Sequence, residues 1–214
     1  MLRLITFEGC DGTGKSTHVK LLERHLTAMG HACLSTREPG GSNLGNIIRR
    51  LLEVAPDEEI SDRAELFLYL ADRSQHVREV VRPAIESGKL VLCDRFTDST
   101  LAYQGYGRGV DLDLLRRMNE LASEGIKPDL TFLLDCPVDL FVSRTAKRFI
   151  KQGSPGERDR FESEDSQFHE RVRNGFLKMA GAEPERFVVI AAAAPMQEVD
   201  EKIRAIVQQR LDDC

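Results

Sequence analysis

The sequence predicts a three-layer α/β/α fold, in which helices cover both faces of a five-stranded parallel sheet. Short apolar runs typical of buried strands alternate along the chain with longer segments of helical periodicity. A glycine-rich turn lies between the first predicted strand and the first predicted helix, at the edge where such sheets bind ligands. With 214 residues the chain can bury a sizeable core, and we expect one domain over residues 1–214.

Five segments carry the strand pattern. The run at 90–93 is almost continuously apolar, as in a central parallel strand that is buried on both faces. The predicted strands are 3–7, 32–36, 90–93, 129–135 and 187–190.

Helical periodicity and capping residues define the helices between these strands. Ser61 and Asp111 have the character of N-caps, and Pro83 is expected to kink or restart the helix that follows Ser61. Glycines at 105–109 predict a turn before Asp111. The predicted helices are 17–29, 44–53, 61–88, 111–125, 138 to about 149, 164–179 and 195 to about 211.

Residues 9–16 match the pattern G-x-x-x-x-G-K-[ST]. Glycines allow successive backbone N–H groups to turn around a phosphate, and the following helix adds positive charge at its N-terminus. Lys15 would reach the β- and γ-phosphates of a nucleotide, and the hydroxyl of Ser16 would bind Mg²⁺. The alternative, a turn that binds nothing, gives Lys15 and Ser16 no role. We therefore predict the phosphate-binding loop (P-loop) of a P-loop NTPase fold.

The composition argues against several classes of protein. Lys and Arg number 30 against 35 Asp and Glu, a net charge of −5 without blocks of like charge, so no nucleic-acid partner is expected. Five scattered cysteines without a C-x-x-C pair suit reduced thiols in the cytoplasm. No segment resembles a signal peptide or a run of about 20 apolar residues, so no membrane association is expected.

Polar residues follow two of the predicted strands. Glu38 stands in a Pro-Gly-Gly loop that either is a simple turn or contributes to a ligand site. Asp94 ends the 90–93 strand, where a Walker-B carboxylate would hold Mg²⁺; the alternative role is a helix N-cap. Arg95 needs an anionic partner at a buried strand end, and a phosphate would supply one.

Two further segments have a structural and a functional interpretation. Tyr69 and Arg73 share one helix face; taken singly they are a core residue and a solvated charge, but together they could hold a base. Residues 147–160 are rich in Gly, Pro and Arg, which fits either a solvated basic loop or a lid that neutralises phosphates as it closes. We predict a lid there.

Taken together, these motifs resemble those of bacterial-type thymidylate kinases over essentially the whole chain. The resemblance is carried by residues 9–17, 37–41, Tyr69-x-x-x-Arg73, 94–96 and 102–105, in this order. It implies transfer of the γ-phosphate of ATP to dTMP with Mg²⁺, giving dTDP and ADP for dTTP synthesis. It also implies a homodimer, the strand order 2-3-1-4-5 and a closing lid.

The resemblance also implies roles for individual residues. ATP would be bound by Gly9, Cys10, Asp11, Gly12, Thr13, Gly14, Lys15, Ser16, Thr17 and Arg144, and Mg²⁺ by Ser16 and Asp94. The catalytic cations would be Lys15, Arg95, Arg148 and Arg158. The dTMP site would comprise Asp11, Glu38, Pro39, Arg49, Tyr69, Arg73, Arg95, Thr100, Tyr103 and Gln104, with Asp11 on the sugar, Tyr69 stacked on thymine, and Arg73 and Gln104 on its polar edge.

The chain departs from the family pattern in three places. Gly12 replaces the loop arginine of one branch, so the catalytic cation would come from the lid. The lid is longer by 151–157, which leaves open whether Arg148, Arg158 or Arg160 meets the γ-phosphate. Ala191 replaces an Asp often found after the last strand, which would leave the adenine pocket to backbone groups.

Three other functions fit the sequence less well. A P-loop kinase acting on another acceptor would not explain Tyr69, Arg73 and Gln104. A GTP-dependent switch would need N-K-x-D, whereas residues 126–129 lack the Asn-Lys pair. A nucleic-acid motor would need a basic groove or a second domain, neither of which this acidic chain offers.

Overall fold

A central parallel sheet organises the protein. The computed structural model describes residues 2–54, 60–140, 161 and 164–212. All strand pairs in this part of the chain are parallel, and their order β2-β3-β1-β4-β5 confirms the expected one. The strands are β1 (Leu4–Glu8), β2 (Cys33–Arg37), β3 (Leu90–Asp94), β4 (Leu130–Asp135) and β5 (Phe187–Ala191).

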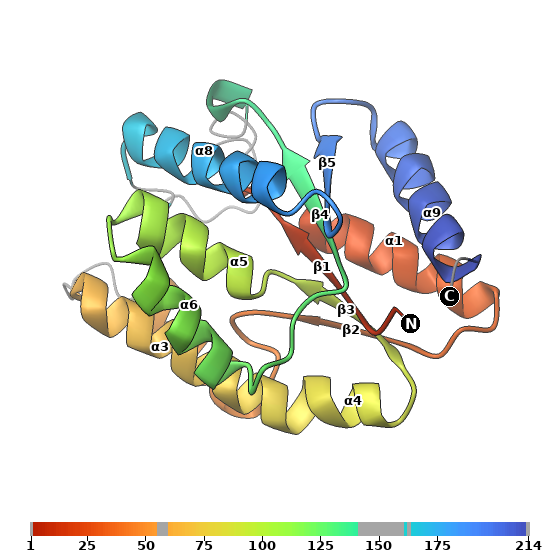
Figure 1. Cartoon of the computed structure of the whole chain (residues 1–214), viewed down its shortest axis with the longest axis horizontal. Helices are drawn as coiled ribbons and strands as arrows, with labels where there is room; N and C mark the ends of the chain where they lie inside the picture. The colour runs from red at the N-terminus through yellow and green to blue at the C-terminus, as the bar shows by residue number, and fades with distance from the viewer. Residues whose placement is uncertain (1, 55–59, 141–160, 162–163, 213–214) are drawn as a thin grey trace.

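Helices cover both faces of this sheet, as predicted (Figure 1). One face carries α1 and α9, while α3, α4, α5, α6 and α8 lie on the other. Their bounds are α1 (Lys15–Ala28), α2 (Asn43–Val54), α3 (Asp62–His76), α4 (Arg82–Glu86), α5 (Thr97–Thr100), α6 (Leu112–Ala122), α8 (Ser166–Ala182) and α9 (Met196–Asp212). The lid expected at 147–160 and most of the helix expected at 138–149 lie outside the described residues.

Both helix N-caps predicted from the sequence are present in the structure. Ser61 accepts a hydrogen bond from the backbone N–H of Ala64 (3.4 Å), and Asp111 accepts one from Leu114 (2.7 Å). The predicted break near Pro83 is also present, because a π-helical segment, η1 (Val77–Val81), separates α3 from α4.

The predicted turn at 105–109 is wrong over most of its length. A second π-helical segment, η2 (Leu101–Gly107), continues through it. The two helical glycines serve close packing instead. A Cβ on Gly105 would lie 2.5 Å from Cδ2 of Leu112, and one on Gly107 would lie 2.6 Å from Cε2 of Phe168. Gly109, just after η2, has the positive φ of 82° that a chain reversal requires.

The apolar core forms two clusters, one larger than the other. Ile5, Phe7 and Phe132 belong to the larger, which includes α1, α8 and α9, and the Phe7 and Phe132 rings lie 5.3 Å apart. Leu4 and Val91 belong to the smaller one, beneath η1 and α4. Because all the described strand pairs are parallel, the carboxyl ends of the five strands meet at one edge of the sheet. No helix in the described part of the chain is long and apolar enough to cross a membrane.

Candidate active site

The loop after β1 has the backbone conformation of a phosphate cradle. Gly9 has φ 129°, and a Cβ there would lie 2.5 Å from the carbonyl oxygen of Leu134, so no larger residue fits. Gly14 has φ 94° and is the N-cap of α1, whose first N–H groups therefore face the loop. The helix dipole adds to the attraction for an anion at this point.

Lys15 holds its ammonium group inside the loop. Its Nζ donates to the carbonyl oxygens of Gly9 (3.0 Å) and Cys10 (2.7 Å). Burial, together with the charge of Arg95, lowers the pKa of Lys15 from its usual value. A phosphate in the cradle would supply a negative partner to this buried cation.

Ser16 and Asp94 meet where α1 begins and β3 ends. The Ser16 hydroxyl donates to Oδ2 of Asp94. Asp94 is not a helix N-cap, because α5 starts at Thr97 with Phe96 in the cap position. The two side chains place hard oxygen donors together beside the P-loop, a donor set that fits Mg²⁺.

Arg95 is held over the P-loop in a left-handed backbone conformation, with φ 70°. Its Nη2 donates to Oδ1 of Asp11 (2.5 Å) and to the hydroxyl of Tyr103 (3.2 Å), and its Nη1 donates to Gly9 O (3.1 Å). Burial, the largest single influence, opposes the charged guanidinium, but Asp11, Tyr103, Asp94 and Glu8 together outweigh it and raise the pKa of Arg95 well above its usual value. Arg95 therefore stays cationic between the loop and Tyr103.

Glu8 holds the segment after Arg95 in place by hydrogen bonds. This fully buried residue accepts hydrogen bonds from Phe96 N (2.7 Å) and from the Ser99 hydroxyl (2.6 Å). Burial, reinforced by Asp98, raises its pKa to about 8. Glu8 was not predicted from the sequence, although a carboxylate that ends an otherwise apolar strand was a signal that could have identified it.

Arg73 is the hub of a buried polar network, so its interpretation as a solvated charge is wrong. Its side chain is 2% exposed. It donates to Glu38 Oε2 (2.9 Å), Thr100 Oγ1 (2.8 Å), Asn119 Oδ1 (2.5 Å) and Phe96 O (2.9 Å). The network joins the Pro-Gly-Gly loop to α3, α5 and α6.

Two further residues of α3 hold that loop. His76 Nδ1 lies 2.9 Å from Glu38 Oε1, and its Nε2 lies 2.7 Å from the Thr36 hydroxyl. Asp72 accepts from the backbone N–H of Gly40 (3.0 Å). Burial, followed by repulsion from Glu38, raises the pKa of Asp72 to about 6. Sequence reasoning missed both, although His76 lies three residues after Arg73, on the same helix face.

The remaining predicted acceptor residues surround this network. Arg49 donates to the carbonyl oxygen of Pro39 (3.1 Å), and Gln104 donates to Glu65 (2.9 Å). The ring of Tyr69 lies nearly parallel to that of Phe161, with centroids 6.1 Å apart. Phe161 was not predicted from the sequence as a site residue.

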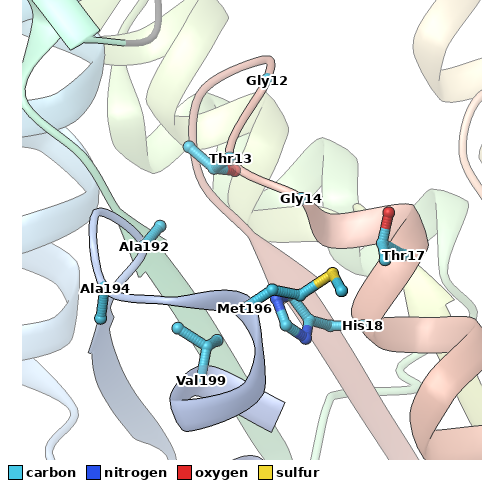
Figure 2. A pocket seen from close by; sticks show the side chains of 9 residues that line it. All are labelled: Gly12, Thr13, Gly14, Thr17, His18, Ala192, Ala194, Met196 and Val199. Carbon is cyan, nitrogen blue, oxygen red and sulfur yellow. The ribbon is translucent and has the colours of Figure 1, made fainter. Parts of the chain in front are cut away.

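A pocket of about 200 Å³ opens beside the P-loop (Figure 2). One side comes from the loop and α1, the other from the turn between β5 and α9 and from the first residues of α9. It is lined by Gly12, Thr13, Gly14, Thr17, His18, Ala192, Ala194, Met196 and Val199. Its walls are mainly apolar, as in pockets for planar ligands. Nδ1 of His18 is buried without a hydrogen-bond partner among the described residues, and burial lowers the His18 pKa.

Comparison with known proteins agrees with this geometry. The family model described as thymidylate kinase matches residues 7–203. The chain belongs to the thymidylate kinase family. It is 51% identical to a thymidylate kinase of Desulfovibrio desulfuricans over 97% of this chain and 95% of that protein. It is 49% identical to a thymidylate kinase of Geotalea uraniireducens over 97% of both.

The fold agrees with a solved member of the family. The crystal structure of thymidylate kinase from Ehrlichia chaffeensis matches with a TM-score of 0.76 and 33% identity, covering 96% of this chain and 98% of that one. The protein thus has the P-loop NTPase fold that the motif at 9–16 predicts. The predicted thymidylate kinase residues Arg144, Arg148 and Arg158 lie outside the described part of the chain, as does Arg160.

Proposed function

We propose that this thymidylate kinase family member transfers the γ-phosphate of ATP to dTMP, forming ADP and dTDP for dTTP synthesis. The observation that carries the proposal is the ion pair between Arg95 and Asp11 (2.5 Å), which joins the P-loop to the end of β3. It puts a fixed cation between the phosphate cradle and the polar network around Arg73. Donor and acceptor sites would therefore meet at Arg95.

On the donor side, the residues of the P-loop would bind the phosphates of ATP. Lys15 and the N–H groups of the loop supply positive charge, and the adjoining pocket has the apolar walls that a purine needs. His18, whose Nδ1 lacks a partner among the described residues, would offer that base a polar contact. Ala191 is not among the lining residues, and its neighbours Ala192 and Ala194 leave room for a flat ring.

On the acceptor side, Asp11 would accept from the sugar 3′-hydroxyl, beside Tyr103, whose buried ring would exclude a ribose 2′-hydroxyl. Tyr69 would stack on thymine. The other proposed contacts are Arg73, Gln104 and Thr100 to the base, and Glu38, Pro39, Arg49 and Arg95 around the monophosphate.

We assign the chemistry to alignment and charge neutralisation. Phosphoryl transfer has no covalent step for the protein to perform, so positioned cations suffice. Lys15 would neutralise the donor phosphates, while Arg95 orients the attacking oxygen of the acceptor phosphate. Arg148 and Arg158 are proposed as further cations at the γ-phosphate, and Arg144 as a donor-site contact.

Ser16 and Asp94 would hold Mg²⁺, which would supply positive charge to neutralise the phosphates of ATP. Asp94→Asn is expected to raise the Mg²⁺ concentration needed for half-maximal turnover by about 10-fold or more. Turnover measured against free Mg²⁺ at fixed ATP tests this. Asp135→Asn is the matched control, since Asp135 ends β4 but pairs with Arg173 (2.7 Å). Equal Mg²⁺ dependence of Asp94→Asn and wild type would exclude Asp94 from the metal site.

Product analysis tests the proposed reaction. Incubation with ATP, Mg²⁺ and dTMP, followed by chromatography, should give ADP and dTDP in equal amounts. Omitting dTMP should abolish ADP formation. ADP formation that does not depend on dTMP would instead indicate an NTPase.

We also propose a homodimer, formed through neighbouring helices that expose apolar side chains. Leu44, Ile47 and Leu51 form a stripe on α2, each 41–51% exposed, and Phe67 on the adjacent α3 is 59% exposed. An apolar surface of this kind is typical of protein interfaces.

Introducing a charge into this stripe should therefore prevent association. Ile47→Glu is expected to give the monomer mass in light scattering after gel filtration, while wild type gives the dimer mass. Met29→Glu, on an exposed apolar residue at the end of α1, is the control and should remain dimeric. Dimers of unchanged stability in Ile47→Glu would exclude this face as the interface.

A cytoplasmic location completes the proposal. It is supported by the absence of a disulfide among the four described cysteines, Cys10, Cys33, Cys93 and Cys136, which suits a reducing compartment.

A further inference from the structure

A buried carboxylate, that of Glu65, contacts Gln104, one of the residues proposed to bind the base. Glu65 of α3 is 0% exposed, and Gln104 of η2 is 2% exposed. The amide nitrogen of Gln104 donates to Oε1 of Glu65 (2.9 Å). Gln104 is among the residues proposed above to contact the base and Glu65 is not, so Glu65 would act on the base through Gln104.

Arg108 fixes the carboxylate of Glu65. Its Nη2 lies 3.0 Å from Oε2 and its Nε 3.3 Å from Oε1. Arg108 is itself held by Glu164 (2.6 Å) and by the rings of Phe161 and Phe168, whose centroids lie 5.5 and 5.1 Å from its guanidinium carbon. A carboxylate paired in this way only accepts hydrogen bonds.

This arrangement determines which way the amide of Gln104 faces. Because Glu65 can only accept, the amide must turn its nitrogen toward Glu65 and its carbonyl oxygen away from it. That oxygen accepts no hydrogen bond from any residue that the structure describes. It is therefore available as an acceptor for an N–H group of a ligand.

We propose that Glu65 is a positioning residue that makes the site select pyrimidines with an N3–H donor. Thymine and uracil carry a hydrogen at N3, which the fixed oxygen of Gln104 would accept. Cytosine has an unprotonated N3, so the same oxygen would face the lone pair of that nitrogen. The two acceptor atoms would repel each other. The inference rests on the proposed function, since it assumes that Gln104 meets the base.

The test compares Glu65→Leu with wild type, using kcat/KM for dTMP and dUMP and the inhibition constant of dCMP. Without the carboxylate, the amide of Gln104 can rotate and offer its N–H₂ to cytosine. We expect the preference for dTMP over dCMP to fall about 10-fold or more. The ratio of dTMP to dUMP should be unchanged, because both bases carry N3–H, and the KM for ATP should be unchanged.

Two controls separate positioning from packing. Glu164→Leu removes a partner of Arg108 but leaves the contact between Glu65 and Gln104, and should retain the preference for dTMP. In a Gln104→Met background, Glu65→Leu should cause no further loss of preference, because Glu65 acts through Gln104.

Three outcomes would overturn the inference. They are an unchanged preference in Glu65→Leu, an equal loss in Glu164→Leu, or an additive loss in the double variant. If Glu65→Leu does not fold, Glu65→Gln takes its place; its amide can donate as well as accept, so the same loss of preference is expected. Absence of dTMP turnover in wild type would contradict the proposed function itself.

Discussion

Arg95→Ala is expected to lower kcat/KM for dTMP by about 10²–10³-fold, the usual effect of removing one preorganised donor from a transition state. The guanidinium is held by Asp11, Gly9 O and Tyr103, so it needs no reorganisation when the acceptor binds. Affinity for ATP, measured by titration calorimetry, should change little because Lys15 and the loop amides remain.

Arg95→Lys is the informative companion variant. Lysine keeps the positive charge but cannot reach two partners in one plane, so its kcat/KM should lie between those of wild type and Arg95→Ala. Wild-type turnover in Arg95→Ala would exclude a role for Arg95 in phosphoryl transfer. A parallel loss of ATP affinity would place it on the donor side instead.

Arg73→Met is expected to destabilise the fold as well as impair dTMP use. The change leaves the carboxylate of Glu38, 3% exposed, without its cation, and it also removes the donors to Thr100 and Asn119. Breaking a buried ion pair by removing one partner costs about 3–5 kcal/mol. Urea denaturation measures the free energy of unfolding, and the KM for dTMP in the folded variant should rise.

Arg116→Met is the matched control for this loss of stability. Arg116 pairs with Asp113 at 2.6 Å, but both side chains are more than half exposed. An exposed pair contributes about 0–1 kcal/mol, so this variant should unfold at nearly the wild-type denaturant concentration. If Arg73→Met also unfolded at nearly the wild-type denaturant concentration, the buried network would not stabilise the fold.

Local sequence patterns were sufficient to predict the framework of the site. The five strands, the described helices between them and the P-loop follow from period and spacing, because a buried parallel strand and a phosphate cradle each impose strict local requirements. The contact between Ser16 and Asp94 was also predictable, because the P-loop motif contains Ser16, and Asp94 ends the central strand beside it. The boundaries differ by one to three residues, as at α1, which begins at Lys15 rather than Thr17.

The residues that support the site could not be predicted in the same way. Glu8, Glu65 and Asn119 act through contacts with residues far away in the sequence. Glu8 carried one local signal, as the carboxylate that ends an apolar strand. No local pattern distinguishes Glu65 or Asn119 from an exposed polar residue of a helix. The π-helical geometry of η2 depends on Gly105 and Gly107 packing against α6 and α8, which only the assembled fold reveals. These contacts determine how the predicted residues are oriented.

The central claim is that this site binds a thymine deoxynucleotide as phosphoryl acceptor. The most direct measurement is kcat/KM with ATP and Mg²⁺ for dTMP, dUMP, UMP, CMP, GMP and AMP, followed by coupled ADP release. The assigned residues predict a strong preference for dTMP, with UMP disfavoured by Tyr103 and CMP by both Tyr103 and Gln104. Turnover of another acceptor in preference to dTMP would keep the phosphoryl-transfer chemistry but contradict the base and sugar assignments.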